Sequence, residues 1–211
     1  MPQPLFLSLD GIDGTGKSTQ VRRLVETLRA GGASVTACVD PGGTELGAKL
    51  REILLHGRAT AIDARAEALL FMASRAELVA RVIRPALARG EVVVSDRFLL
   101  ANVVYQGHAG GLDPRELWNV GRFATGGLMP DLAIVFDLPV SVARARRGRP
   151  ADRIESRGAD YDERVRNGYL VEARANPAGI AVLDASPDAD AVHAATLALV
   201  RPLLAARGHP V

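Results

Sequence analysis

The sequence contains a single cysteine, Cys38, so an internal disulfide bond is excluded. It also lacks a long uninterrupted hydrophobic run. The first apolar segment, Leu5–Leu9, has no basic region before it and stops at Asp10, which is too early for a signal peptide or a membrane span. We therefore expect a soluble, cytoplasmic protein that has no membrane partner.

Neither sign of charge predominates, because 26 basic residues face 24 acidic residues and leave a formal net charge of +2. The electrostatic field of so small a surplus is weak, so a pI near 9.0 does not by itself predict nucleic-acid binding. The four histidines show no metal-ligand spacing. Together with the single cysteine, they do not favour a structural metal site.

Lysine is almost absent, since Lys17 and Lys49 are the only two and arginine supplies the other basic side chains. A motif that requires lysine is therefore informative here. Residues 11–18, Gly-Ile-Asp-Gly-Thr-Gly-Lys-Ser, fit the phosphate-binding pattern G-x-x-x-x-G-K-[ST]. In such a loop the backbone N–H groups face phosphate oxygens, Lys17 neutralises the β- and γ-phosphates, and Ser18 ligates Mg²⁺.

Apolar strands alternate with amphipathic helices along the whole chain. The expected strands are 5–9, 34–38, 91–95, 132–136 and 180–183. The expected helices are 17–30, 46–55, 64–88 with an interruption near Pro85, 99–105, 115–123, 161–175 and 189–205. This order predicts an α/β fold of the P-loop NTPase type, in which helices flank a five-stranded parallel sheet in three layers. We expect one domain over residues 1–211.

Asp96 and Arg97 directly follow the expected strand 91–95. Ligands bind at the carboxyl edge of a doubly wound sheet, so Asp96 is a candidate for holding Mg²⁺ or its water shell. Arg97 is a candidate for a bidentate phosphate contact. The alternative is that Asp96 caps the next helix and Arg97 forms a surface ion pair.

Several blocks of sequence resemble the thymidylate kinase family in order and spacing, over essentially the whole chain. The blocks are Phe6–Gln20, Asp40–Thr44, Leu70–Glu77, Ser95–Phe98, Tyr105–Gly107 and Asp152–Glu155. The resemblance implies a homodimeric enzyme that uses Mg²⁺ and transfers the γ-phosphoryl group of ATP to dTMP. It implies small nucleotides, and no nucleic acid, as partners.

The same resemblance assigns roles to individual residues. ATP would be bound by Gly11, Ile12, Asp13, Gly14, Thr15, Gly16, Lys17, Ser18 and Thr19. The acceptor dTMP would be bound by Asp10, Arg51, Phe71, Arg75, Arg97, Asn102, Tyr105 and Gln106, with Phe71 stacked on thymine and Arg75 at the base edge. The metal ligands would be Ser18 and Asp96, directly or through water. The catalytic residues would be Lys17, Asp96, Arg97, Arg149 and Arg153.

An arginine-rich segment, residues 144–157, resembles the lid of the family. Its arginines are Arg144, Arg146, Arg147, Arg149, Arg153 and Arg157. One subtype of the family carries its catalytic arginine inside the phosphate loop, where this chain has Gly14, so the lid is expected to supply it. Arginines that close over the moving phosphoryl group stabilise its spreading negative charge. A solvated basic face is the plainer alternative.

The sequence departs from the family pattern in three places: Val39-Asp40 replaces the usual Arg-Glu, Phe98 replaces tyrosine or histidine, and Glu45 replaces proline. Other functions therefore stay open. A kinase for dUMP, CMP or a modified thymidylate would differ around Phe71, Arg75 and Asn102. A P-loop GTPase switch or regulatory ATPase is disfavoured, because the sequence lacks the guanine-specificity motif Asn-Lys-x-Asp. An arginine-rich nucleic-acid binder is disfavoured, because no aromatic residues are interleaved with the arginines to stack on bases. Core packing of Phe71 is a further alternative.

Overall fold

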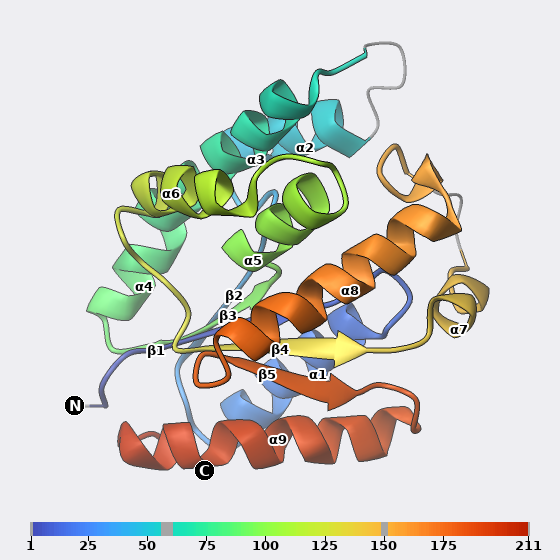
Figure 1. Cartoon of the computed structure of the whole chain (residues 1–211). Helices are drawn as coiled ribbons and strands as arrows, with labels where there is room; N and C mark the ends of the chain where they lie inside the picture. The colour runs from blue at the N-terminus through green and yellow to red at the C-terminus, as the bar shows by residue number, and fades with distance from the viewer. Residues whose placement is uncertain (1, 56–60, 149–151, 211) are drawn as a thin grey trace.

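The computed structural model describes residues 2–55, 61–148 and 152–210 and has a five-stranded, all-parallel sheet at its centre (Figure 1). The strands are β1 (Leu5–Asp10), β2 (Val35–Val39), β3 (Val92–Asp96), β4 (Leu132–Asp137) and β5 (Ile180–Asp184), in the order β2-β3-β1-β4-β5. The predicted α/β fold class, with its five-stranded parallel sheet flanked by helices, is thereby confirmed.

The register of the sheet brings two strand ends together. β1 pairs with β3, with Leu9 opposite Asp96, and with β4 on its other side, with Asp10 opposite Val135. The chain leaves β1 toward β2 but leaves β3 in the opposite direction, toward β4. The carboxyl ends of β1 and β3 therefore flank the point where the strand order reverses, which is where ligands bind in such sheets.

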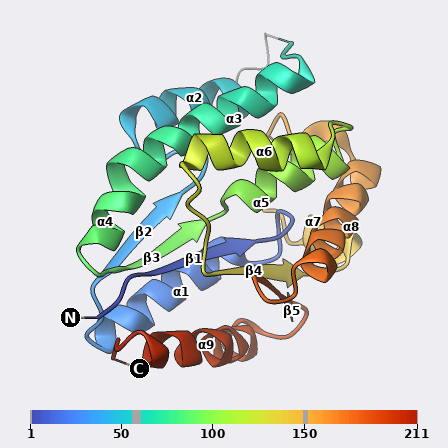
Figure 2. The ribbon, with the colours of Figure 1, turned by 60° about the vertical axis from the view of Figure 1, so that its left-hand side comes forward.

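Helices cover both faces of the sheet (Figure 2). On one face lie α1 (Lys17–Ala30) and α9 (Ala189–Ala206), and on the other lie α3 (Ala64–Leu78), α5 (Leu99–Asn102), α6 (Pro114–Thr125) and α8 (Ala159–Ala175). The remaining helices are α2 (Glu45–Leu55), α4 (Arg84–Ala88) and α7 (Val140–Ala145). Although α9 is long and apolar enough to be a candidate membrane span, it packs here against α1 and β5.

The apolar core follows the two-residue period of the strands. Leu5 and Leu7 of β1 are buried in one cluster with Leu24 of α1, whereas Phe6 between them is buried in a second cluster with Met72 of α3. Successive side chains of a strand point to opposite faces, so a strand buried on both faces is largely apolar. This explains why the strands appear in the sequence as continuous hydrophobic runs.

Side-chain caps set several helix boundaries. Asp63 accepts a hydrogen bond from the Arg65 N–H at the start of α3, and Asp113 does the same for the Arg115 N–H at the start of α6. At its other end α6 stops at Gly126, whose φ of 57° is left-handed. Such caps satisfy N–H groups that the first helical turn leaves unpaired.

The helices differ from the prediction in two respects, their π-helical turns and one additional helix. The sequence predicts an interruption near Pro85, and the structure has a π-helical turn there, Val79–Ile83. A second π-helical segment, Val103–His108, extends α5. Helix α7 was missed, because it is short and its sequence, Val-Ser-Val-Ala-Arg-Ala, lacks a full amphipathic period. As a result, Arg144 of the arginine-rich segment belongs to a regular helix.

Helix α7 fixes one glycine of the phosphate loop. Gly14 and Gly16 both have positive φ, 95° and 90°. A Cβ atom on Gly14 would lie 2.0 Å from the carbonyl oxygen of Ala143, whereas a Cβ on Gly16 would meet no described atom within 4 Å. Gly14 is therefore required by space as well as by backbone conformation.

We predict that Gly16→Ala lowers the free energy of unfolding by about 1–2 kcal/mol, through backbone strain alone. Gly14→Ala should lower it by a further ~1–3 kcal/mol, since the backbone at Ala143 has to move. Urea unfolding of both variants measures the difference. Equal losses would mean that α7 does not constrain the loop.

Candidate active site

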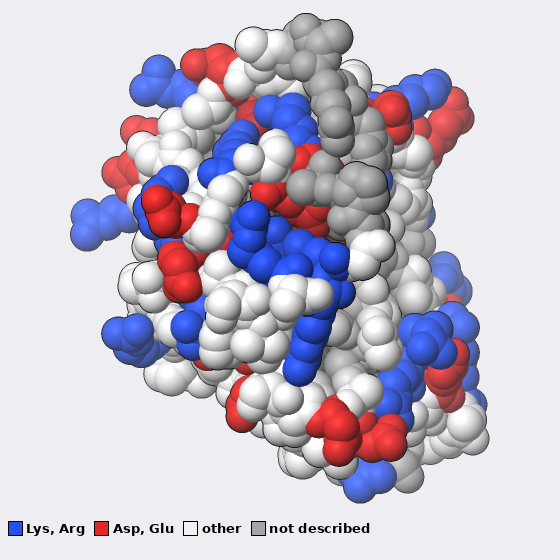
Figure 3. Space-filling view, turned by 90° about the vertical axis from the view of Figure 1, so that its right-hand side faces the viewer, with Lys and Arg blue, Asp and Glu red and all other residues white. Residues whose placement is uncertain are grey.

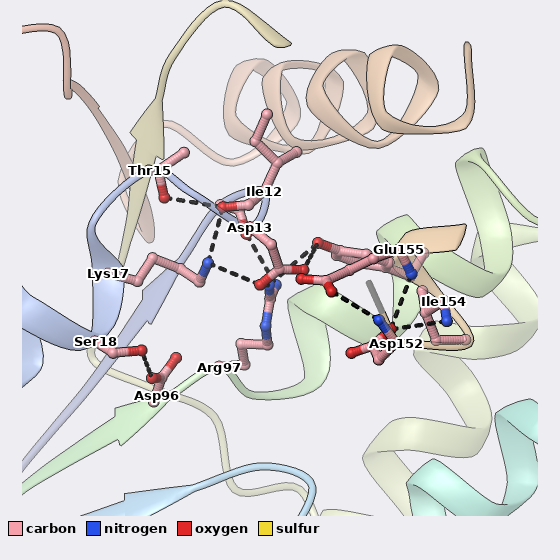
Figure 4. A network of polar contacts seen from close by, with 12 residues as sticks. Ile12, Asp13, Thr15, Lys17, Ser18, Asp96, Arg97, Asp152, Ile154 and Glu155 are labelled. Atoms are coloured by element: carbon pink, nitrogen blue, oxygen red, sulfur yellow. Dashed lines mark hydrogen bonds and ion pairs between the residues drawn. The ribbon is translucent and has the colours of Figure 1, made fainter. Parts of the chain in front are cut away.

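The phosphate loop lies between β1 and α1 and wraps around the amine of Lys17. The Lys17 Nζ donates a hydrogen bond of 2.9 Å to the Ile12 carbonyl oxygen and lies 3.6 Å from Asp13 Oδ1 (Figure 4). Burial, assisted by nearby Arg97, lowers the pKa of Lys17, against the opposing effect of Asp13 and other carboxylates. The loop thus holds a preformed cation at the N-terminus of a helix, which is an anion-binding arrangement.

Two oxygen-bearing side chains, both predicted Mg²⁺ ligands, meet beside the loop. The Ser18 Oγ donates a 2.7 Å hydrogen bond to Asp96 Oδ2, across the gap between α1 and the end of β3 (Figure 4). A hydroxyl and a carboxylate next to a phosphate site suit Mg²⁺, which takes few protein oxygens and completes its coordination with water and phosphate. Among the described residues no group of three or more His, Cys, Asp or Glu side chains could hold a metal ion.

Arg97 occupies the centre of the site in an unusual backbone conformation. Its φ is 68°, the left-handed region that non-glycine residues rarely adopt, and such strain costs on the order of 1–3 kcal/mol. Its guanidinium donates to the Gly11 carbonyl oxygen at 2.9 Å and to Asp13 Oδ1 at 2.8 Å. It also donates to the hydroxyls of Tyr105 and Tyr169, both at 3.1 Å.

Asp13 is enclosed by cations. Burial alone would raise its pKa, but the charges of Arg97 and Lys17 outweigh burial and hold the pKa of this carboxyl well below its usual range. Arg147 approaches the same residue from the arginine-rich segment, and its Nε donates to the Asp13 carbonyl oxygen at 3.0 Å. Asp13 therefore links the loop, Arg97 and the arginine-rich segment.

A cavity opens from the phosphate loop toward α3 and α5. Its lining includes Lys17, Ser18, Asp96, Asp152 and Ile154, together with every predicted dTMP-binding residue except Asp10: Arg51, Phe71, Arg75, Arg97, Asn102, Tyr105 and Gln106. The tertiary structure thus brings together residues from α2, α3, β3 and the α5 region. Their roles toward a ligand stay predictions.

The pair Arg75–Asp40 explains one departure from the family pattern. The Arg75 Nε donates to Asp40 Oδ2 at 2.6 Å, and both side chains are buried. Arg75 also donates to Asn102 Oδ1 at 2.9 Å. Burying a guanidinium requires a counter-charge and hydrogen-bond acceptors, and Asp40 supplies the charge here. Val39 beside it lines the cavity.

Asp10 lies beneath the cavity and does not line it. Complete burial raises its pKa from 3.8 to about 6, although Arg97, the Ser8 hydrogen bond and Lys17 act in the opposite direction. The Ser8 Oγ donates to Asp10 Oδ2 at 2.9 Å. Within the described part of the chain, the other oxygen, Oδ1, has no hydrogen-bond partner. Burying the ionised Asp10 carboxylate therefore lowers the free energy of unfolding.

The arginine-rich segment divides into two parts. Arg146 and Arg147 line a second cavity together with Gly14, Lys17 and Thr19 of the phosphate loop. Arg153, a predicted catalytic residue, instead donates to Glu67 Oε2 at 2.6 Å and to the Leu54 carbonyl oxygen at 2.7 Å. The other predicted arginine, Arg149, lies outside the described residues.

Basic and acidic side chains are interleaved on the surface beside this segment. Figure 3, which views the molecule from the right of Figure 1, shows patches of Lys and Arg next to patches of Asp and Glu rather than one continuous basic surface. Arg144 and Arg147 both pair with Asp162 of α8, at 2.7 and 3.0 Å. Much of the positive charge that stands out in the sequence is thus locally compensated.

Three residues of the site were missed from the sequence. Tyr169 of α8 reaches Arg97, Glu67 of α3 holds Arg153, and Arg147 was counted among the arginines but not assigned to the loop. Nothing in the local sequence distinguishes Tyr169 or Glu67, because their partners lie 72 and 86 positions away. The arginine cluster itself was the only available signal for Arg147.

Comparisons with known proteins agree on one family. The family model for thymidylate kinase matches residues 9–196. A thymidylate kinase of Rhodopirellula baltica is 49% identical over 86% of this chain and 74% of its own length. One of Symbiobacterium thermophilum is 44% identical over 96% and 95%. The crystal structure of thymidylate kinase from Ehrlichia chaffeensis, at 27% identity, covers 94% of this chain and 99% of its own with a TM-score of 0.77.

The raised pKa of Asp10 generates a pH-dependent prediction. Because the folded-state pKa, about 6, exceeds the ordinary value of 3.8, folding favours the protonated acid. The contribution of Asp10 to the free energy of unfolding is fully present below pH 3.8 and is lost as the pH rises through 6. The difference corresponds to about 3 kcal/mol. We expect Asp10→Asn to raise the free energy of unfolding by up to that amount at pH 8 and progressively less toward pH 4.

Urea unfolding at several pH values measures this effect. Asp137→Asn is the matched control, because Asp137 also ends a strand but its carboxylate pairs with Arg166 at 2.7 Å and is partly exposed. The control should show no pH-dependent gain. An Asp10→Asn variant whose stability follows the wild type at every pH would contradict the assignment.

Proposed function

The chain belongs to the thymidylate kinase family, and on that basis we propose how its residues divide the phosphorylation of dTMP by ATP. The observation that carries the proposal is one cavity with two chemically different ends. Lys17 and Ser18 of the phosphate loop line one end, Phe71, Arg75 and Asn102 line the other, and Arg97 lies between them. The arrangement suits a triphosphate donor and a pyrimidine monophosphate acceptor.

The reaction needs positioning more than proton transfer. An oxygen of the dTMP phosphate attacks the γ-phosphorus of ATP, and the bond from that phosphorus to the β–γ bridging oxygen breaks, giving dTDP and ADP. The acceptor is already anionic, so no general base is required. Charge that develops on the transferred group is neutralised by Lys17, and by Arg97 from the acceptor side.

The acceptor nucleotide is proposed to bind between α3 and α5. Phe71 offers a flat apolar ring for stacking on thymine, and Arg75 offers a donor at the base edge, one helical turn away. Asn102 and Tyr105 would approach base and sugar, Gln106 would lie beside them, and Arg51 would join Arg97 on the monophosphate.

Mg²⁺ is proposed to bind at Ser18 Oγ and Asp96 Oδ2, where it would neutralise charge on the ATP phosphates. Asp10 would add negative charge beneath the acceptor phosphate and metal. Arg149 and Arg153 stay the catalytic arginines implied by the family. We add Arg147, since it lines the loop cavity and contacts Asp13.

We propose a homodimer, with residues 1–211 as one domain and residues 144–157 as its lid. Exposed apolar side chains lie on α2, α3 and α6, which are neighbours in Figure 2: Leu46, Ile53, Leu69, Val120 and, at 89% exposure, Phe123. A second copy covering them would remove this surface from water. The interleaved surface charge and the packing of α9 support a cytoplasmic enzyme without nucleic-acid or membrane partners.

The activity is tested by ADP release with ATP and Mg²⁺ across dTMP, dUMP, UMP, CMP, AMP and GMP. We expect a clear preference for dTMP. Lys17→Ala and Arg97→Ala should each lower kcat by about 10²–10³-fold, as loss of a charge-stabilising donor does. Lys49→Ala, at the only other lysine, which is exposed and pairs with Glu45, should leave kinetics unchanged. Preference for another acceptor would overturn the roles of Phe71 and Arg75.

The dimer is tested by light scattering after size-exclusion chromatography. Phe123→Glu places a charge at the most exposed apolar side chain of α6 and should yield monomer. Val182→Glu, on β5 and 45% exposed, is the control and should stay dimeric. A wild-type monomer at micromolar concentration, or an unaltered Phe123→Glu dimer, would count against this interface.

A further inference from the structure

Glu67 is a buried carboxylate for which the proposed reaction has no direct use. It lies in the first turn of α3, a position that is normally exposed, yet it is only 1% exposed. Its Oε2 accepts from Arg153 and from Arg157, both at 2.6 Å. Its Oε1 accepts from Gln106 Nε2 at 2.9 Å. Two arginines of the arginine-rich segment and one residue of the acceptor cavity thus meet on one side chain.

A chain of hydrogen bonds continues from Gln106 to the base end of the cavity. Asn102 Nδ2 donates to Gln106 Oε1 at 2.8 Å, and Arg75 Nη1 donates to Asn102 Oδ1 at 2.9 Å. Arg75 can only donate, and an ionised Glu67 can only accept. The two ends therefore dictate the orientation of both amides between them, which fixes the donors and acceptors that Asn102 and Gln106 present to a nucleotide.

The contacts on the other side of Glu67 hold the end of the arginine-rich segment, residues 152–157. Arg153 also donates from Nε to the Leu54 carbonyl oxygen, and its backbone N–H donates to the Leu55 carbonyl oxygen at 3.0 Å. Arg157 lies over the ring of Tyr161 at 5.0 Å and donates to its hydroxyl. Asp152 and Ile154, adjacent to Arg153, line the acceptor cavity. The position of this cavity wall therefore depends on Glu67.

We propose that Glu67 is a positioning residue for the phosphoryl transfer, because it holds Arg153 and Arg157 against the acceptor cavity and, through Gln106 and Asn102, orients the groups that face the base. It touches neither substrate in this scheme. The inference rests on the proposed dTMP kinase activity. It requires an ionised carboxylate with both oxygens engaged, which an amide cannot replace.

Glu67→Gln is the sharpest variant, since it preserves size. The single amide oxygen of the new side chain can accept from the arginines or from Gln106, but not from both, and its NH₂ group then faces another donor. We expect kcat to fall by about 100-fold, as misplacement of reacting groups does. The KM for dTMP should rise on the order of tenfold, while the KM for ATP stays near its wild-type value.

The KM values separate positioning from general damage. A variant that merely folds less well would lose kcat in proportion to the active fraction and keep both KM values. Glu77→Gln, on the same helix but partly exposed and paired with Arg81, is the matched control and should leave all three constants unchanged. A Glu67→Gln enzyme with a wild-type KM for dTMP would overturn the proposal.

Arg157→Gln probes the same contact from its other partner and keeps the test decisive if Glu67→Gln folds poorly. Arg157→Gln should itself raise the KM for dTMP, whereas Arg164→Gln, whose guanidinium lies over the same Tyr161 ring, should not. The losses from Glu67→Gln and Arg157→Gln should be less than multiplicative when combined, because both break one contact. Independent losses, or an unchanged Arg157→Gln enzyme, would contradict the proposal. Wild-type turnover with dTMP tests the function separately.

Discussion

The structure depends most on the guanidinium of Arg97 at the end of β3. It contacts the phosphate loop at Gly11 and Asp13, the π-helical segment at Tyr105, and α8 at Tyr169. These three elements come from separate parts of the chain, and one side chain contacts all of them. The strained backbone of Arg97 persists because so many partners determine its position.

Buried charge is the main cost of this arrangement. Four strands end in aspartate, and a fifth, β2, is followed directly by Asp40. Asp96, Asp137 and Asp184 have partners at or near the surface, whereas Asp10 and Asp40 are buried. Asp40 pairs with Arg75, yet in both buried carboxylates one oxygen has no hydrogen-bond partner among the described residues, and burial raises the pKa of both. A site that concentrates cations needs such carboxylates, because their negative charge offsets the repulsion between the cations when no nucleotide is bound.

Side chains that line the cavity beside the phosphate loop form one polar network with Arg153 and Arg157 of the arginine-rich segment. Asp40, Arg75, Asn102, Gln106 and Glu67 are joined in sequence by hydrogen bonds, and the network ends at Arg153 and Arg157. Because its members are buried, removing one leaves its neighbours without partners. The shorter acid at position 40 and the phenylalanine at position 98 are accommodated within it: Asp40 reaches Arg75 directly, and the Phe98 ring lies under the Arg75 guanidinium at 5.7 Å.

The sequence alone determined the sheet, the phosphate loop and most of the residues that line the cavity beside it, because each depends on local patterns: apolar runs, glycines before a lysine, and blocks at fixed spacing. It correctly placed α1 at residues 17–30. It could not identify α7, the π-helical turns, or Tyr169 and Glu67, since these depend on contacts between distant segments. Periodicity records which face of an element is buried. Only the tertiary structure decided which buried charge meets which arginine, because pairing depends on distance in space and not on spacing along the chain.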